Sequence, residues 1–206
     1  MTPILKDKTV LASDPTAPLA VLIHGRAGNV EVMWAFRRCI PEHWSILAFE
    51  APYPDPVGGF SWWLIDSVDT RTGGLSAAAL VVDGVRGALE RYQLSPARIV
   101  GLGFSQGAGT LSTVIQREGL FDAVALLAGF VVELPERPPV APCTVFMAHG
   151  DQDEMVSVER ARRGRDYLRH LGYAVEYHED PVGHKVGTSG MRALRVWLAG
   201  SPACSR

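Results

Sequence analysis

A serine between two glycines is the first residue in this sequence whose setting favours chemistry. Ser105 lies in the sequence G-F-S-Q-G (residues 103–107), directly after an apolar run at residues 99–104 and before a segment with helical periodicity. A serine in such a strand-to-helix turn is exposed at the end of its strand, and the glycines let other backbone approach closely. The amide groups of the following helix favour developing negative charge. The pattern therefore predicts a nucleophilic serine.

Two further residues have the types needed to activate this serine. Asp153 follows an apolar run at residues 144–148, and His184 follows another at residues 174–177. If these runs are parallel strands, their carboxyl ends meet at one edge of the sheet, so that three remote side chains converge there. We therefore expect Ser105 to attack, His184 to act as the general base and Asp153 to orient the imidazole.

A glycine-rich turn provides candidate donors for the negative charge of such a reaction. The sequence H-G-R-A-G at residues 24–28 follows an apolar run at residues 19–23. Its backbone N–H at Arg26, together with that of Gln106, could form an oxyanion hole. His24 could instead bind a metal, but no other histidine or acid lies near it at ligand spacing. We favour a histidine that braces the turn, and expect no metal or organic cofactor.

The glycines before and after the serine also permit a different interpretation. Gly101, Gly103 and Gly107 approximate a dinucleotide-binding loop. However, this loop comes after several strand-helix units, whereas the fingerprint belongs to the first one. In addition, the acid that should bind the ribose, Asp122, begins the next predicted strand instead of ending it. We therefore favour the nucleophile.

The elements that must position these residues appear as short apolar runs that alternate with longer segments of helical periodicity. The predicted strands cover residues 9–12, 19–23, 45–49, 99–104, 123–127, 144–148 and 174–177; the predicted helices cover residues 31–40, 76–92, 106–117, 158–171 and 189–198. This alternation is typical of α/β proteins. We expect a single domain over residues 1–206, with a mostly parallel central sheet of about seven strands and helices on both faces.

Two connections are too long to be simple turns. Residues 51–74 contain several prolines and aromatic side chains, and residues 129–142 contain further prolines. Both follow predicted strands at the edge where an open sheet builds its site, so we expect them to be substrate-site loops. The candidate pocket residues, for each of which ordinary core packing is the alternative, are Phe60, Trp62, Trp63, Phe130, Met155 and Val156.

Composition excludes several classes of function. The chain has 206 residues, 47% of them hydrophobic, and its net charge of -2 leaves no basic field for nucleic acid. The cysteines, at positions 39, 143 and 204, are too scattered for a disulfide framework or a metal clip, so we expect thiols. No signal sequence or long apolar segment is present, so we expect a cytoplasmic protein without an integral membrane segment. The sequence leaves the oligomeric state open.

Four motifs together resemble those of the phospholipase/carboxylesterase family of serine hydrolases, which includes the acyl-protein thioesterases. They are L-x-H-G-x-x-G at residues 22–28, G-F-S-Q-G at 103–107, H-G-x-x-D at 149–153 and G-H at 183–184. The resemblance covers nearly the whole chain and implies an α/β-hydrolase fold. It also implies that Asp153 is the catalytic acid and that Asp151 is its structural neighbour.

The resemblance implies a serine carboxylesterase that hydrolyses small-molecule esters through an acyl-enzyme intermediate. A thioesterase or lysophospholipase acting on long acyl chains is the alternative. Simple ester hydrolysis is favoured over it, because residues 154–157 lack the Pro-x-Val-Pro that usually follows the acid in this family. The family's W-F-D motif likewise appears only as W-W-L-I-D at residues 62–66. A non-catalytic binding protein on the same fold is the third possibility, but no member of the triad is missing.

Overall fold

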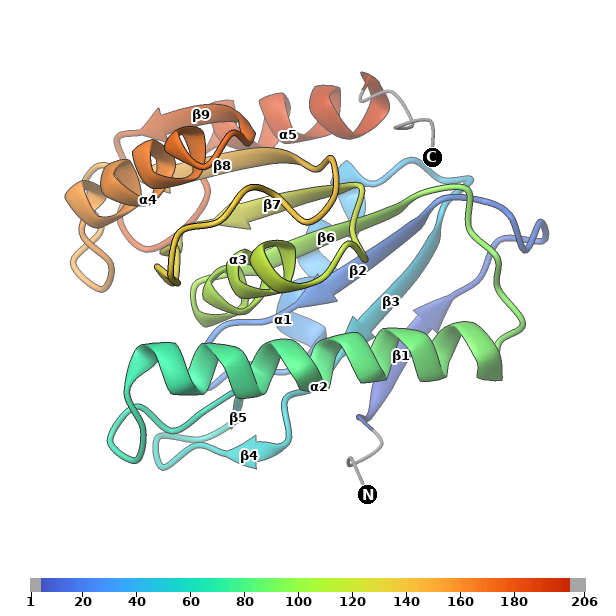
Figure 1. The fold of residues 1–206 in the computed structure, drawn as a ribbon. Helices are drawn as coiled ribbons and strands as arrows, with labels where there is room; N and C mark the ends of the chain where they lie inside the picture. Colours follow the sequence, from blue (N-terminus) through green and yellow to red (C-terminus); the bar gives the residue numbers. More distant parts are fainter. Residues whose placement is uncertain (1–4, 201–206) are drawn as a thin grey trace.

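A seven-stranded sheet forms the centre of the computed structural model, which describes residues 5–200 (Figure 1). The strands are β1 (Asp7–Val10), β2 (Leu19–Ile23), β3 (Ser45–Phe49), β6 (Ile99–Phe104), β7 (Ala123–Leu127), β8 (Thr144–Gly150) and β9 (Ala174–Asp180). Their order across the sheet is β1-β3-β2-β6-β7-β8-β9. Only β1 is antiparallel to its neighbour; every other pair is parallel. The carboxyl ends of six strands therefore share one edge.

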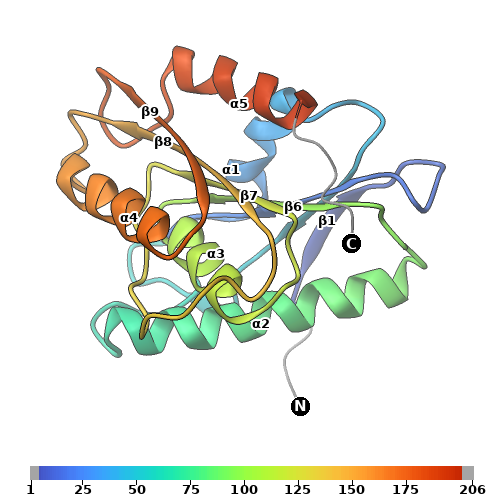
Figure 2. The ribbon, with the colours of Figure 1, turned by 45° about the horizontal axis from the view of Figure 1, so that its top comes forward.

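Helices cover both faces of this sheet (Figure 2). They are α1 (Val30–Trp34), the 3-10 helix η1 (Ala35–Cys39), α2 (Thr70–Arg91), α3 (Gln106–Arg117), α4 (Val158–His170) and α5 (Thr188–Gly200). One core cluster joins the sheet to α2, α3 and α4, and a second joins it to α1, η1 and α5. Strands β2, β3 and β7 are buried along their whole length, which explains why all their residues except Ser45 are apolar. In the part described, no helix is long and apolar enough to cross a membrane.

The predicted strands are all present, four of them with the predicted ends and three with shifted ends. The first strand lies at Asp7–Val10 instead of residues 9–12, while β8 and β9 continue to Gly150 and Asp180. The helix expected at residues 31–40 is wrong in part, because only Val30–Trp34 is α-helical and a 3-10 helix follows. That 3-10 stretch ends at Cys39, before the proline at position 41.

The second helix extends into residues that were predicted as loop. It begins at Thr70 instead of residue 76, because the carboxylate of Asp69 accepts hydrogen bonds from the backbone N–H groups of Arg71 and Thr72. Gly73 lies inside this helix, where a Cβ atom would come within 2.4 Å of the Trp63 ring. Gly73 therefore allows the helix to pack closely against Trp63, although the low helical propensity of glycine predicts a loop.

The remaining part of the long connection forms a small hairpin. Strands β4 (Tyr53–Pro54) and β5 (Phe60–Ser61) pair antiparallel outside the main sheet. Phe60 also pairs with Gly28 in an isolated bridge, with its N–H donating to the Gly28 carbonyl at 2.9 Å. The hairpin therefore packs on the turn that follows β2, at the carboxyl edge of the sheet.

Candidate active site

Ser105 occupies a strained turn between β6 and α3. Its backbone angles, φ 51° and ψ -112°, lie in a region that residues other than glycine rarely adopt. The turn is held by a hydrogen bond from the Ser105 N–H to Leu127 O at 2.9 Å and by another from Ala108 N–H to Ser105 O at 3.0 Å. Strain of this kind persists only where surrounding structure enforces it, and it clusters at functional sites.

The glycines on either side of the serine make this turn possible. A Cβ atom on Gly107 would lie 2.1 Å from the Ile23 carbonyl oxygen, and one on Gly103 would lie 2.4 Å from that of Gly107. No side chain fits at these distances, so the prediction that the glycines permit close backbone approach is confirmed. Asp122 lies at the opposite edge of the sheet, where its carboxylate accepts from Ile99 N–H at 2.8 Å. The dinucleotide interpretation is therefore wrong.

The predicted acid and base are in direct contact. His184 Nδ1 lies 2.7 Å from Asp153 Oδ2, and the other oxygen of this buried carboxylate accepts from the N–H groups of Met155 and Val156. Burial raises the pKa of Asp153, but the hydrogen bonds from Val156, His184 and Met155 outweigh it and hold the pKa below its usual value. An ionised Asp153 keeps the His184 proton on Nδ1, which leaves Nε2 as a base.

Two adjacent loops bring this pair to the serine. Gln152 N–H donates to Val182 O at 3.1 Å, so the loop after β8 lies against the loop after β9. The His184 ring packs edge-on against Phe104, with the ring centroids 5.1 Å apart, and Phe104 immediately precedes Ser105. By contrast, the side chain of Asp151 is exposed. The structure therefore gathers residues from three different strand ends.

A second histidine supports the acid, and the sequence analysis did not assign it a role. His149 is buried, and its Nε2 lies 2.8 Å from Val156 O and 3.4 Å from Asp153 Oδ2. The contact with a carbonyl oxygen requires a proton on Nε2. The imidazole thus stabilises the loop that carries Asp153. The sequence feature that could have indicated this role is the His-Gly pair at the end of β8.

The turn at residues 24–28 lies directly against the nucleophile. A Cβ atom on Gly25 would come within 3.1 Å of Ser105 Cβ. His24 accepts from Ala51 N–H at Nε2 and contacts Gly25 O through Nδ1, at 2.9 and 2.6 Å. Burial lowers the pKa of His24, and these contacts require a neutral ring with its proton on Nδ1. Both ring nitrogens are used by backbone, so the bracing role is confirmed.

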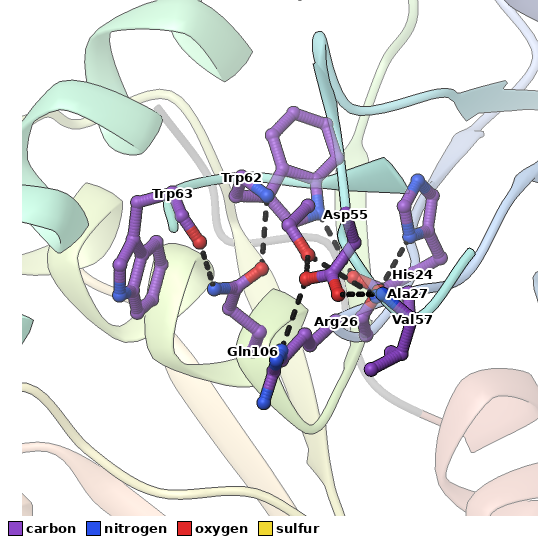
Figure 3. Close-up of polar contacts among 10 residues, drawn as sticks. His24, Arg26, Ala27, Asp55, Val57, Trp62, Trp63 and Gln106 are labelled. Atoms are coloured by element: carbon purple, nitrogen blue, oxygen red, sulfur yellow. Dashed lines mark hydrogen bonds and ion pairs between the residues drawn. The ribbon is translucent and has the colours of Figure 1, made fainter. Parts of the chain in front are cut away.

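The side chain of Gln106 joins the nucleophile turn to the connection that precedes α2 (Figure 3). Its Oε1 accepts from Trp62 N–H at 2.9 Å, and its Nε2 donates to Trp63 O at 2.8 Å. The Trp62 indole N–H in turn donates to His24 O at 2.8 Å. The buried Gln106 amide is thus linked to the His24 turn through Trp62.

A buried carboxylate, Asp55, holds the other end of the turn. Its Oδ2 accepts from Arg26 Nε at 3.0 Å and from Ser61 Oγ at 2.7 Å, and Ser61 Oγ accepts from Ala27 N–H at 3.1 Å (Figure 3). The Arg26 hydrogen bond, followed by that of Ser61, lowers the Asp55 pKa to about 2. Sequence reasoning missed this residue, because its contact with Arg26 joins two segments that lie 29 residues apart.

Replacing Asp55 with asparagine should reduce stability in a pH-dependent way. A carboxyl group with a lowered pKa in the folded protein stabilises the fold above its unfolded pKa, about 3.9, and loses that contribution as the pH falls towards its folded value. The difference in unfolding free energy between wild type and Asp55→Asn should therefore be constant near neutrality and shrink below about pH 4. Urea unfolding at several pH values measures it, and a constant difference down to pH 2 would contradict the ion pair.

Five of the six candidate pocket residues are buried or half-buried. Trp62, Trp63, Phe130 and Val156 belong to one core cluster, with Trp62 fully buried, and Phe60 packs against that cluster. Met155 is 73% exposed. Trp63 and Phe130 meet edge-to-face with their centroids 6.4 Å apart. Their role in substrate binding stays a prediction.

Comparison with known proteins gives consistent similarities. A family model described as Phospholipase/Carboxylesterase matches residues 7–201. Acyl-protein thioesterase 1 of Neurospora crassa is 32% identical over 112 residues, which are 49% of this chain and 45% of that protein. The match thus spans less than half of that curated relative.

Solved structures share the fold at low sequence identity. A carboxylesterase of Bacillus cereus aligns with a TM-score of 0.85 at 18% identity, covering 95% of this chain and 94% of that one. A carboxylesterase of Mesorhizobium loti aligns at 0.84 and 22%, covering 96% and 95%. Esterase PE8 aligns at 0.81 and 23%, covering 95% and 98%. The expected sheet, with helices on both faces, is therefore confirmed as an α/β-hydrolase fold.

Proposed function

Since this chain belongs to the phospholipase/carboxylesterase family and is thus an ester hydrolase, we propose that it acts through a triad of Ser105, His184 and Asp153. The observation that carries the proposal is the 2.7 Å contact between His184 and the buried Asp153, beside a serine in a strained elbow. This combination supplies a nucleophile, a base and an orienting acid.

In the proposed reaction, Ser105 Oγ attacks the ester carbonyl while His184 Nε2 takes its proton. The imidazolium then protonates the leaving alcohol, and water deprotonated by His184 hydrolyses the acyl-enzyme. The oxyanion is held by the backbone N–H groups of Arg26 and Gln106. Gln106 is the first residue of α3, where amide groups have no acceptor within the helix, and this supports its role.

The proposed substrates are small-molecule carboxylic esters. A thioesterase acting on long acyl chains is the second candidate, favoured by the similarity to acyl-protein thioesterase 1. Both reactions use the same triad, so they differ in the leaving group and in the length of the acyl pocket. A binding protein without activity is disfavoured, because the acid and base are in contact.

A series of p-nitrophenyl esters graded by acyl length, with a matching series of thioesters, tests the proposal. Turnover together with labelling of Ser105 by a fluorophosphonate is the expected result, and preference for long thioesters would favour the second candidate. Absence of both turnover and labelling in the folded protein would refute the proposed function.

The connection before α2 should govern acyl-length preference. Trp63→Phe keeps an aromatic ring against Phe130 but shortens it, so the ratio of long-chain to short-chain turnover should change. About 1 to 3 kcal/mol per misfitted methylene is the expected scale. Trp62→Ala, in contrast, should cost about 3 to 5 kcal/mol of stability, because this indole is fully buried.

Thermal melts must accompany these kinetics, so that a change in the pocket is distinguished from a loss of stability. If Trp63→Phe melts like wild type and leaves the ratio of long-chain to short-chain turnover unchanged, Trp63 is core and does not line the pocket. The same measurements on Met155→Ala test the exposed member of the predicted set.

We also propose a cytoplasmic location and one domain over residues 1–206. The family match over residues 7–201 supports the second point. Cys39 and Cys143 are free cysteines, with Sγ 3.7 Å from Met191 O and from Thr144 O respectively. Such thiols are common in reducing compartments. Cys204 lies outside the described residues.

A further inference from the structure

A small cavity rich in arginine lies between the first turns of α2 and α4. It has a volume of about 230 Å³. Its walls include Arg71 from α2, Arg160 and Arg163 from α4, and the segment Val131, Val132 and Glu133 from the connection that follows β7. Three arginines from two different helices thus line one hollow.

Nearby carboxylates balance only part of the positive charge of this cavity, because Glu133 interacts electrostatically with Arg160 and Glu159 with Arg163. Within residues 5–200, no ion pair involves Arg71, Arg160 or Arg163. Glu133 is the one carboxylate among the described lining residues, which leaves two excess positive charges. Burial, followed by repulsion from Arg163, lowers the pKa of Arg160. A bound anion would relieve both effects.

The cavity adjoins the candidate active site through Phe130. The Phe130 ring packs on Gly109, in the first turn of α3, whose N–H donates to Ser105 O at 3.2 Å. The guanidinium carbon of Arg160 lies 4.0 Å from the centroid of the same ring. In Figure 1 the first turns of α2, α3 and α4 lie together on the left, where the strands end. The Phe130 ring therefore lies between Arg160 and the first turn of α3, the helix that follows the nucleophile.

We propose that this cavity binds an anionic group, a carboxylate or a phosphate, at the end of the ester substrate remote from the reacting carbonyl. The inference rests on the proposed function and names its substrate class. Guanidinium groups bind both anions through paired N–H donors. Stacking on Phe130 holds Arg160 in a defined orientation, which reduces the entropy lost on binding.

Charged and neutral esters of equal chain length test this proposal. Mono-p-nitrophenyl adipate, suberate and sebacate are compared with p-nitrophenyl hexanoate, octanoate and decanoate, and the ratio of kcat/KM for each charged and neutral pair is measured. Arg160→Gln and Arg163→Gln should each lower the ratio roughly tenfold for the length that reaches the cavity. Glu133→Gln should raise it, because the competing carboxylate is removed.

Arg162→Gln is the matched control. Arg162 belongs to the same helix but donates to Glu179 at 2.7 and 2.8 Å, outside the cavity, so its removal changes the net charge equally without touching the site. Its ratio should equal that of wild type. Equal ratios in Arg160→Gln, Arg163→Gln and Arg162→Gln at every length would overturn the carboxylate form of the inference.

A binding measurement separates this inference from the proposed function. Calorimetry on Ser105→Ala protein uses suberate and inorganic phosphate as probes, with Ser105→Ala/Arg160→Gln for comparison. Binding of either probe that is lost in the double variant supports the subsite and identifies its anion. Binding of neither probe, together with unchanged ester ratios, refutes it. If no variant hydrolyses any ester but a probe still binds, the proposed function fails and the anion site stands.

Discussion

Ser105→Ala should lower ester turnover by about six orders of magnitude, as removal of a triad serine does in other enzymes. Without the Ser105 hydroxyl the acyl-enzyme cannot form, and the oxyanion donors alone provide only residual catalysis. Initial rates with the best p-nitrophenyl ester measure the effect, and labelling by a fluorophosphonate should disappear with activity. A variant that keeps wild-type activity and still labels would place the nucleophile elsewhere.

The strain at position 105 provides an internal control for folding. Alanine must adopt the same positive φ of 51° as serine, whereas glycine adopts it without strain. Ser105→Gly should therefore be inactive yet more stable than Ser105→Ala, by about 1 kcal/mol. Thermal melts of the two variants check this. A glycine variant less stable than the alanine variant would show that the turn is not strained in solution.

Asp153→Asn should lower kcat by about four orders of magnitude. An amide cannot hold the His184 proton on Nδ1 or stabilise the imidazolium, although its volume is nearly that of the carboxylate. The substitution also removes the negative charge that the N–H groups of Met155 and Val156 stabilise. Steady-state kinetics at the optimum of the wild-type protein measure the loss, with circular dichroism to verify the fold.

Asp151→Asn is the matched comparison, because Asp151 lies two residues earlier in the same loop and exposes its side chain. Its N–H donates to Asp180 O at 2.9 Å, a backbone contact that the substitution leaves in place. Activity should therefore change little. The reverse ranking of the two variants would assign the acid to Asp151.

Local patterns in the sequence determined the strands and the candidate triad. Apolar runs long enough to span a buried sheet predict strands almost wherever they occur, and a site residue on the loop that follows a run lies near that strand's end. Ser105, Asp153 and His184 could therefore be placed at one edge without knowledge of any contact. The glycines at positions 103 and 107 were also predictable, because a side chain at either position would collide with neighbouring backbone.

Only the tertiary structure decided what supports these residues. The Asp55 bridge to Arg26, the Gln106 amide between two tryptophans and the arginine cavity each join segments remote in sequence, and no periodicity or spacing encodes such contacts. The close packing of Gly73, inside α2, against Trp63 likewise became visible only in the structure. Strand and turn preferences act over a few neighbouring residues, whereas charge pairing and close packing depend on which chain segments the completed fold brings together.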